Sequence, residues 1–493
     1  MGLHKNRLNL STEGGRSSLG RRSFLVAAAG TASALFSKSR MEAANEPSSA
    51  TALCAAQANA AAEPLALDGG RPVRAAKLGA NYPGPLYYDD EEKAELMEVL
   101  ERRAPFRWYG IGPKGGEPRK CNEFERELAA HQHTRYALAV TSGTMALYTA
   151  MAALGVGPGD EVILPTWTWY SCYNAIVAAG ATPVFAEIDD SMDIDPDDLE
   201  RRITPRTKVI MAVHISGEPA EMDTILKIAR QHRLKVLEDC AQSAGATYHG
   251  KQVGSIGDCG IYSFQECKTI TAGEGGAVVT NDPLIFERAA RFHDLGQLRK
   301  GHQDMLGETP HFPQLLGGQF RMSEFTGAVL RAQLRKLDRI LADFRDKADR
   351  VTKGIQDLPG IQFRKSNDHA GAVGSAVYFR TAGKAQRDHF IRALEAENVP
   401  AMTMEGSVIL PVVPYVQQKQ NPNLDANWPS FSSPAAKALQ YGPSCCPRTL
   451  AIYDRYVGVP MDPKYSDQDV ADIIAAVRKV YSAIISDSPE SRS

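Results

Sequence analysis

The chain lacks an excess of either charge. Its 493 residues include 56 Lys and Arg against 58 Asp and Glu, a formal net charge of −2 at pH 7. Nucleic-acid grooves and polybasic membrane faces need clustered positive charge, so no nucleic-acid partner is predicted. The sequence also has no Gly-Lys-Ser/Thr phosphate loop, which is the usual sign of a nucleoside triphosphate site. A nucleotide cofactor is therefore a poor fit.

Cysteine is sparse, with eight residues scattered along the chain. No Cys/His group has the spacing of metal ligands, so no metal site is predicted, and a disulfide scaffold is not supported. Cys240 and Cys259 fall in apolar segments and are expected to be small buried hydrophobes. The adjacent pair Cys445-Cys446 is unusual, but neighbouring cysteines rarely bridge each other.

Beyond residue 60 no segment is long and apolar enough to cross a membrane, but the first sixty residues differ from the rest. Arg21-Arg22 precedes the apolar run Val26–Phe36, which is too short for a stable transmembrane helix and has the anatomy of a signal peptide. Paired arginines followed by Phe-Leu resemble a twin-arginine (Tat) signal. We therefore expect residues 1–60 to be a leader and linker, with a cleavage site at Ala58-Asn-Ala60, and the Tat machinery to export the protein to the periplasm.

Two alternatives to export stay open. Arg-Arg pairs are common in proteins that are not exported. Met41 could also be the true start of the protein. In that case residues 1–40 are not part of the protein, and a cytoplasmic location is expected.

From about Leu65 the chain alternates between apolar β-prone runs and helical patterns. Continuous apolar strands separated by helices indicate an α/β fold with a largely parallel sheet covered on both faces. In such sheets ligands bind at the carboxyl ends of the strands. The expected strands are 136–140, 161–165, 182–188, 208–213, 235–240, a run ending at Ser263 and Phe264, and 277–280, and the expected helices include 143–154, one through Ala175 and Ala179, and 221–230.

At this length the chain exceeds a single core, so two domains are expected after the leader. Apolar residues recur at steps of three and four from Ser323 past Asp349, which predicts a long amphipathic helix. This helix would connect a large domain, 61–345, to a smaller α+β C-terminal domain, 346–493. The smaller domain would contain a strand at 376–380 and helices at 387–397 and 467–484.

Two polar stretches have structural interpretations. The acidic run 189–198 lacks the central glycine and closing glutamate of a calcium loop, whereas Asp195-Pro196 suits a helix N-cap followed by proline at the first helical position. The segment 416–433 is rich in Pro, Asn and Ser, which predicts a mobile surface loop. Loops of this kind often carry substrate contacts.

One lysine lies between two apolar strands, ahead of a Gly-Glu-Gly-Gly turn. Burying Lys268 as a free cation is costly, and the cost disappears if its amine forms a covalent imine, as in Schiff-base enzymes. The alternative is a solvated loop lysine beside a glycine turn. The window around Lys268 does not by itself decide between them.

Three further features lie at predicted strand ends. Thr141–Met145 places small residues at a helix start, where exposed N–H groups bind phosphate. Asp239 ends a buried strand, where a carboxylate is costly unless it faces a cation such as a protonated ring nitrogen. Ser263 can add a hydroxyl to a phosphate site. An amine, an acid and an anion nest are what pyridoxal 5′-phosphate (PLP), a phosphorylated pyridine aldehyde, requires.

From about Leu65 to Val480 the sequence resembles the DegT/DnrJ/StrS family of PLP-dependent sugar aminotransferases, which have the fold type I architecture. It is most similar to the branch acting on keto-inositols and related cyclic ketones. The motifs that carry the resemblance are Ser142-Gly-Thr144, Leu154-Gly-Val-Gly-Pro-Gly-Asp-Glu-Val162, Ile203-Thr-Pro-Arg-Thr-Lys208, Glu238-Asp-Cys-Ala-Gln242, Ser263-Phe264, Lys268, Gly273-Glu-Gly-Gly276 and Arg321-Met-Ser-Glu324.

The resemblance implies roles for individual residues. Lys268 would form the aldimine with PLP and then shuttle a proton, and Asp239 would keep the pyridine nitrogen protonated. Gln242 would contact the ring hydroxyl. Trp169 would stack on the cofactor ring, with core packing as the alternative. Phosphate would be bound by Thr144, by the backbone of Met145 and by Ser263.

The resemblance also implies a homodimer in which each site is built from two chains. Gln319 stands where the family usually has an asparagine that reaches the neighbouring subunit's phosphate, and its amide keeps the donor. Glu218 and Glu221 replace residues that are often an amide and an aspartate. These two departures leave substrate specificity open more than catalysis.

The predicted function is transfer of an amino group from glutamate or glutamine to a keto-sugar or cyclic keto-polyol. The alternatives are a non-catalytic PLP-fold sensor or binding protein and a PLP-dependent sugar-modifying enzyme of another reaction type. Some relatives dehydrate sugars with a histidine in place of the lysine, so Lys268 argues against that reaction. The sequence identifies neither the acceptor ketone nor the amine donor.

Overall fold

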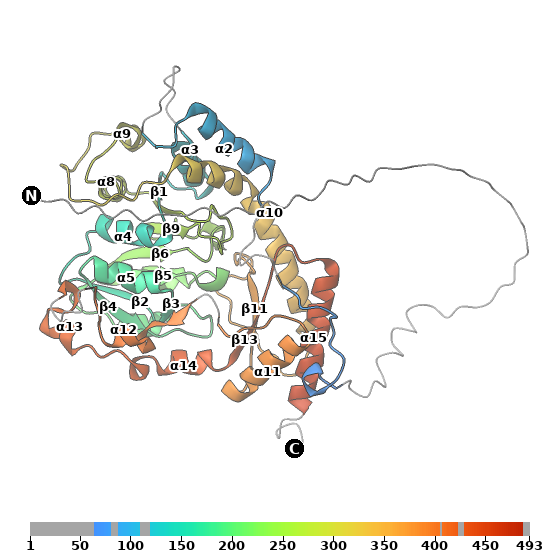
Figure 1. Ribbon diagram of the computed structural model, residues 1–493. Helices are drawn as coiled ribbons and strands as arrows, with labels where there is room; N and C mark the ends of the chain where they lie inside the picture. The colour runs from blue at the N-terminus through green and yellow to red at the C-terminus, as the bar shows by residue number, and fades with distance from the viewer. Residues whose placement is uncertain (1–63, 80–86, 109–118, 405–406, 423–427, 487–493) are drawn as a thin grey trace, which may run out of the picture. The chain divides into compact units, whose positions relative to one another are not determined.

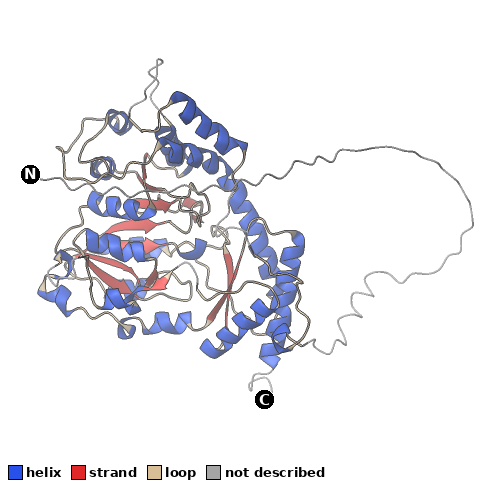
Figure 2. Ribbon diagram, in the orientation of Figure 1, coloured by secondary structure: helices blue, strands red, loops and turns tan. Residues whose placement is uncertain are grey.

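A seven-stranded, mostly parallel sheet with helices on both faces forms the centre of the protein (Figures 1 and 2). The computed structural model describes residues 64–79, 87–108, 119–404, 407–422 and 428–486. The predicted leader, with its arginine pair and cleavage site, and Met41 lie outside the described residues. Residues 61–493 are assigned to one compact unit.

The strand order shows which strand ends share an edge. Parallel pairing joins β4 to β2, β2 to β5, β5 to β6 and β6 to β9, whereas β10 is antiparallel to both β9 and β1. Because β10 reverses direction between them, β1 and β9 run the same way, and their carboxyl ends lie at the same edge as that of β6. In spatial order the strands are β1 (Tyr136–Val140), β10 (Gly276–Thr280), β9 (Cys259–Ser263), β6 (Lys235–Asp239), β5 (Thr207–Val213), β2 (Glu161–Pro165) and β4 (Thr182–Ala186).

Both faces of this sheet are buried. Along β1, Ala137 and Ala139 belong to one hydrophobic core, and Tyr136, Leu138 and Val140 to the other. This alternation is the period of two expected of a strand whose faces are both covered. One core contains side chains of α3 (Lys120–His131), α7 (Met222–His232) and α10 (Glu324–Ile355); the other contains those of α4 (Gly143–Ala153), α5 (Tyr170–Ala178) and α8 (Pro283–Phe292).

A small antiparallel pair of strands, β11 (Ala376–Arg380) and β13 (Tyr456–Pro460), forms a second sheet beside α10. Helices α11 (Lys384–Ala396) and α15 (Asp467–Ser486) pack against each other there, and α15 also contacts α10. The predicted domain boundary at residue 345 falls inside α10, and the division into two domains stays a prediction.

The remaining elements are short or peripheral. They are η1 (Ala66–Asp68), α2 (Asp90–Arg102), β3 (Trp167–Thr168), α6 (Pro196–Arg201), η2 (Ile215–Gly217), β7 (Thr247–Tyr248), β8 (Lys251–Gln252), α9 (Lys300–Leu306), β12 (Val408–Ile409), η3 (Leu410–Val412), α12 (Pro414–Gln417), η4 (Pro429–Phe431), α13 (Pro434–Ala438), η5 (Pro443–Cys445) and α14 (Pro447–Tyr453).

Two local predictions about helix starts are confirmed. Asp195 is the N-cap of α6, its side chain accepts the Asp197 N–H at 3.0 Å, and Pro196 is the first helical residue. The predicted long helix is α10, and its N-cap Ser323 accepts the N–H of Thr326. Both helices begin where a short polar side chain replaces a missing backbone acceptor.

The predicted loop over 416–433 has exposed residues among those described, such as Gln417 and Gln418, but it is anchored in the core at both ends, and its mobility stays a prediction. Val416 and Phe431 are buried in the core that contains α4 and α5. The Trp428 Nε1–H donates to the carbonyl oxygen of Val177 at 3.0 Å. Apolar side chains at the two ends of the segment attach it to the protein despite its polar composition. None of its described residues lines the cavity that holds the candidate site.

Candidate active site

A cavity of about 420 Å³ lies at the carboxyl ends of β1, β6 and β9. It is lined by Thr144, Trp169, Asp239, Gln242, Ser263 and Lys268, which are six of the eight predicted cofactor-site residues. They come together because the three strands run in the same direction: Asp239 and Ser263 are the last residues of β6 and β9, and Thr144 lies four residues after the end of β1. The other two predicted residues, Met145 and Gln319, do not line the cavity.

Asp239 is the buried acid of this cavity, with 4% of its surface exposed. Its Oδ1 accepts the Ala241 N–H at 3.0 Å, and its Oδ2 lies 3.1 Å from Sγ of Cys172, whose thiol donates. Burial, reinforced by the Asp239 charge, raises the pKa of Cys172 well above its ordinary value, so the thiol keeps its proton. A carboxylate has about four acceptor positions, so Asp239 can still accept a hydrogen bond from a protonated ring nitrogen in the cavity.

Lys268 lies in the loop between β9 and β10. Its backbone N–H donates to the carbonyl oxygen of Gln265 at 3.0 Å, and backbone bonds between Phe264 and Gly275 close the loop. Burial lowers the pKa of Lys268, and the Asp239 charge opposes that shift. Within the described residues no carboxylate lies within ion-pair distance of its Nζ. The structure therefore favours a partly buried amine over a solvated loop cation.

The start of α4 forms an anion cradle against the end of β9. Ser142 is the N-cap of α4 and accepts the Met145 N–H at 3.2 Å, so this N–H is already engaged. A Cβ added to Gly143 would lie 2.7 Å from Cβ of Ser263. Only glycine permits this approach. It places the Ser263 hydroxyl beside the N-terminus of an eleven-residue helix, and helix N-termini are common phosphate sites in proteins.

The two remaining predicted contacts also face this cavity. Gln242 is held by two bonds: its Oε1 accepts the Ser216 N–H, and its Nε2 donates to Oγ of Ser407, both at 3.0 Å. Trp169 is 50% exposed and lines the cavity. The indole is therefore not fully packed in the core, and its stacking on a ring in the cavity stays a prediction from the family resemblance.

The comparisons with known proteins agree with this geometry. A model described as the DegT/DnrJ/EryC1/StrS aminotransferase family matches residues 90–429. The chain belongs to this family. Spore coat polysaccharide biosynthesis protein SpsC of Bacillus subtilis (strain 168) is 34% identical over 397 residues, which cover 79% of this chain and 94% of SpsC.

A second relative and a solved structure also support the family assignment. L-glutamine:2-deoxy-scyllo-inosose aminotransferase of Streptomyces kanamyceticus is 36% identical over 321 residues, covering 64% of this chain and 72% of that protein. The crystal structure of 3-amino-5-hydroxybenzoic acid (AHBA) synthase matches with a TM-score of 0.66 and 29% identity, covering 83% of this chain and all of that one. The protein is therefore a PLP-dependent aminotransferase of fold type I, and the predicted fold class is confirmed.

Residues in which the chain departs from the family pattern lie away from the cavity. Gln319 pairs with Asp294 in an isolated antiparallel bridge. Glu218 is buried. Its carboxylate accepts hydrogen bonds from the Ser366 hydroxyl and from the backbone N–H groups of Asn367 and Asp368. Glu221 is the N-cap of α7. Neither glutamate lines the cavity that contains Lys268, and both make hydrogen bonds that hold the local backbone.

Several cavity residues were missed from the sequence. Ser171 contacts Thr144 by a hydroxyl pair 2.7 Å apart, and Gln265, Cys267 and Glu274 line the wall near Lys268. Glu274 belongs to the quoted Gly-Glu-Gly-Gly motif, which was a usable signal. No sequence pattern pointed to Cys172, because its contact with Asp239 joins residues 67 positions apart.

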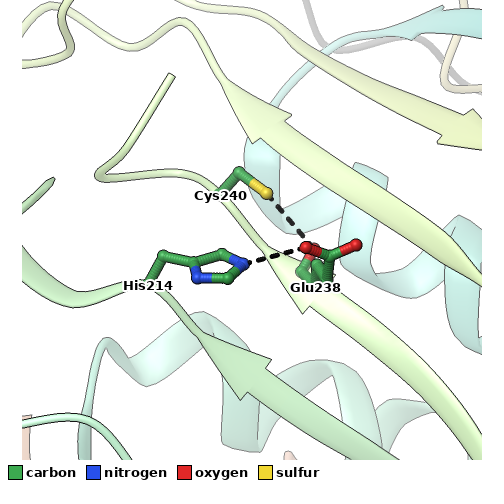
Figure 3. A group of neighbouring side chains, drawn as sticks. All are labelled: His214, Glu238 and Cys240. Atoms are coloured by element: carbon green, nitrogen blue, oxygen red, sulfur yellow. Dashed lines mark hydrogen bonds and ion pairs between the residues drawn. The ribbon is translucent and has the colours of Figure 1, made fainter. Parts of the chain in front are cut away.

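The side chains of His214, Glu238 and Cys240 lie close together, as Figure 3 shows, and their ligand atoms lie within 4.8 Å of one another. Nδ1 of His214 accepts the Ala220 N–H at 2.9 Å, so Nε2 carries the proton and donates to Glu238 at 3.1 Å. Burial raises the pKa of Cys240 well above its ordinary value, whereas a metal needs a thiolate. The Glu238 carboxylate also accepts backbone N–H groups at 2.6–2.8 Å from Gly254, Ile256 and Gly257.

These hydrogen bonds occupy the acceptor positions that a metal would need. The group is therefore a hydrogen-bond network that fixes the end of β6, where Asp239 follows Glu238.

Among the described helices, none is both long and apolar enough to cross a membrane.

Proposed function

We propose that this enzyme transfers an amino group from glutamate or glutamine to a keto-sugar or cyclic keto-polyol. The observation that carries the proposal is that Lys268 and Asp239 face one cavity, with the Gly143–Ser263 cradle beside them. A cavity of about 420 Å³ lies within the size range of small-molecule sites. It is large enough for a cofactor and a single ring to react together.

The residues of the cavity fit PLP. Thr144 and Ser263 would hold its phosphate with the N-terminus of α4, Gln242 would contact its ring hydroxyl, and Trp169 would cover its ring. When bound, PLP supplies an electrophilic aldehyde and an electron sink. Asp239 would hold the proton on the ring nitrogen through its free acceptor position.

Lys268 is proposed to act as nucleophile and as proton carrier. Because its pKa is lowered by burial, a larger fraction of Nζ is neutral near pH 7 than in a solvated lysine. After release, the same Nζ can take a proton at one carbon and return it at another. Both roles need an amine inside the cavity.

The names of two relatives support the donor and the acceptor. One relative uses L-glutamine and 2-deoxy-scyllo-inosose by its name, and another is named GDP-perosamine synthase, from Escherichia coli O157:H7, at 38% identity over 278 residues. Cyclic ketones and keto-sugars are thus the substrate classes to test first.

The test separates an aminotransferase from a non-catalytic PLP-fold protein. Purified protein loaded with PLP is mixed with glutamate or glutamine, and the visible absorbance of the cofactor is followed; keto-sugars and keto-inositols are then added. Lys268→Ala should lose the wild-type absorbance and slow transamination by roughly 10³-fold or more, whereas Lys227→Ala, at an exposed position on α7, should retain both. Undiminished transamination by Lys268→Ala would refute the assignment.

We also propose that the active enzyme is a homodimer in which Gln319 reaches the partner's phosphate. In support, Gln319 does not line the cavity of its own chain. Sedimentation of the PLP-bound protein should give a dimer, and Gln319→Ala should weaken PLP binding without changing the sedimentation. A monomer with full activity would contradict this.

We propose, finally, that the leader directs export by the twin-arginine route. Its support is the order of arginine pair, apolar run and Ala-rich segment in residues 21–60. Fractionation of cells expressing the tagged chain should show processed protein in the periplasm. An Arg21→Lys, Arg22→Lys variant should stay unprocessed. A wild-type product that is entirely cytoplasmic and full-length would refute export.

A further inference from the structure

Cys445 and Cys446 bring two thiols together away from the catalytic cavity. Cys445 ends η5 and Cys446 precedes α14. Their Sγ atoms lie 3.0 and 3.5 Å from the same carbonyl oxygen, that of Gly442. Cys446 is fully buried, whereas Cys445 is partly exposed. The pair therefore combines one partly exposed cysteine with one buried cysteine, and both sulfurs lie against the same carbonyl oxygen.

The neighbouring thiol makes the partly exposed cysteine more acidic. The hydrogen bond from Cys446 is the main cause that lowers the pKa of Cys445 to about 7. The same contact raises the pKa of Cys446. Burial instead raises the pKa of the other buried cysteines, as in Cys121 and Cys259. Cys445 is thus the nucleophilic member, and Cys446 is a protonated partner beside it.

A disulfide bond between Cys445 and Cys446 is unfavourable. Consecutive Cα atoms are about 3.8 Å apart across a trans peptide, which is shorter than the roughly 4.4–6.8 Å found in most disulfides. Two sulfurs that converge but bridge poorly are better placed to bind one atom that forms two bonds to sulfur. Neither cysteine lines the catalytic cavity, and neither has a role in the proposed reaction.

We propose that Cys445 and Cys446 form a dithiol site for thiophilic trivalent arsenic. With an arsenoso compound, the Cys445 thiolate attacks arsenic and Cys446 follows. Two As–S bonds replace the As=O bond, and the two thiol protons leave with the oxygen as one molecule of water. The reaction consumes no oxidant or reductant. Soft ligands of this kind select soft ions over the hard cations held by carboxylates.

The test uses the reduced, PLP-bound protein and phenylarsine oxide. Wild-type protein should take up one phenylarsenic group, seen by intact mass, and lose two thiols that react with a disulfide reagent after denaturation. The adduct should survive washing with a monothiol and be released by a dithiol. Because the second bond forms intramolecularly, removing one sulfur should weaken retention by roughly 100-fold or more.

Variants at matched positions decide whether this pair is the site. Cys445→Ser changes a partly exposed side chain and should abolish the retained adduct, as should Cys446→Ser. Cys267→Ser removes an exposed cysteine of the catalytic cavity and should leave the adduct unchanged. A retained adduct in Cys445→Ser, or a wild-type adduct that consumes one thiol, overturns the proposal. None of these readouts depends on transamination, so they stand apart from the test of the proposed function.

Discussion

Replacing Gly143 by alanine tests whether the approach of α4 to β9 builds the phosphate cradle. The new Cβ would lie 2.7 Å from Cβ and 3.0 Å from Oγ of Ser263, whereas ordinary contact begins near 3.4 Å. The helix and the strand must therefore separate by about 0.7 Å. Neither moves freely, because Leu147 on α4 and Ile261 on β9 are buried in the same core.

Overpacking of this kind costs about 1–3 kcal/mol. Part of the strain should appear as lost stability and part as lost affinity, because the separated elements hold the proposed phosphate ligands. Since about 1.4 kcal/mol is tenfold in affinity, the Kd for PLP should rise measurably, and by at most roughly 150-fold if all of the strain falls on binding. Equilibrium dialysis with absorbance detection measures the Kd, and urea unfolding of the apoprotein measures the stability.

Gly157→Ala is the matched control. Gly157 lies in the turn after α4, its φ is outside the left-handed region, and a Cβ there would meet nothing within 4 Å. We expect its stability to change by less than about 0.5 kcal/mol and its PLP affinity to stay at the wild-type value. If Gly143→Ala binds PLP as tightly as Gly157→Ala does, the close approach is not what forms the cradle.

Three further predictions concern buried polar groups. Cys172→Ser keeps a donor to Asp239 and should bind PLP within about threefold of wild type, whereas Cys172→Ala should bind about tenfold more weakly; equal affinities would exclude the thiol from a positioning role. Glu238→Ala leaves backbone N–H groups unsatisfied and should lower the free energy of unfolding by about 3 kcal/mol or more, and a loss below 1 kcal/mol in urea would count against the network. Burial holds the pKa of His293 near 3 in the folded protein, below its ordinary 6.5. As the pH falls, the unfolded chain therefore protonates His293 before the folded protein does. The contribution of neutral His293 to the free energy of unfolding is full above pH 6.5 and falls by up to about 1.4 kcal/mol per pH unit toward pH 3. His293→Gln should flatten that slope between pH 6.5 and 5, and an unchanged slope would assign it to other groups.

Predictions from the sequence succeeded where a pattern depends on neighbouring residues. Apolar runs located β1, β2, β5 and β6, and the stripe after Ser323 located α10, because periodicity is a local property of the chain. For the segment 416–433 the same reasoning missed the anchoring: its composition is polar, but the few apolar residues at its ends are buried by partners far away in sequence.

The sequence by itself determined the element types, the family and most of the candidate cofactor ligands, since these ligands lie at or within a few residues of a strand end or a helix start. The tertiary structure decided which of them meet. The reversal of β10 aligns the carboxyl ends of β1, β6 and β9 at one edge of the sheet, and Met145 and Gln319 do not line the cavity there. The Cys172–Asp239 contact and the clearance at Gly143 also depend on strand order and packing. Such contacts join residues tens to more than a hundred positions apart, and no local pattern records them.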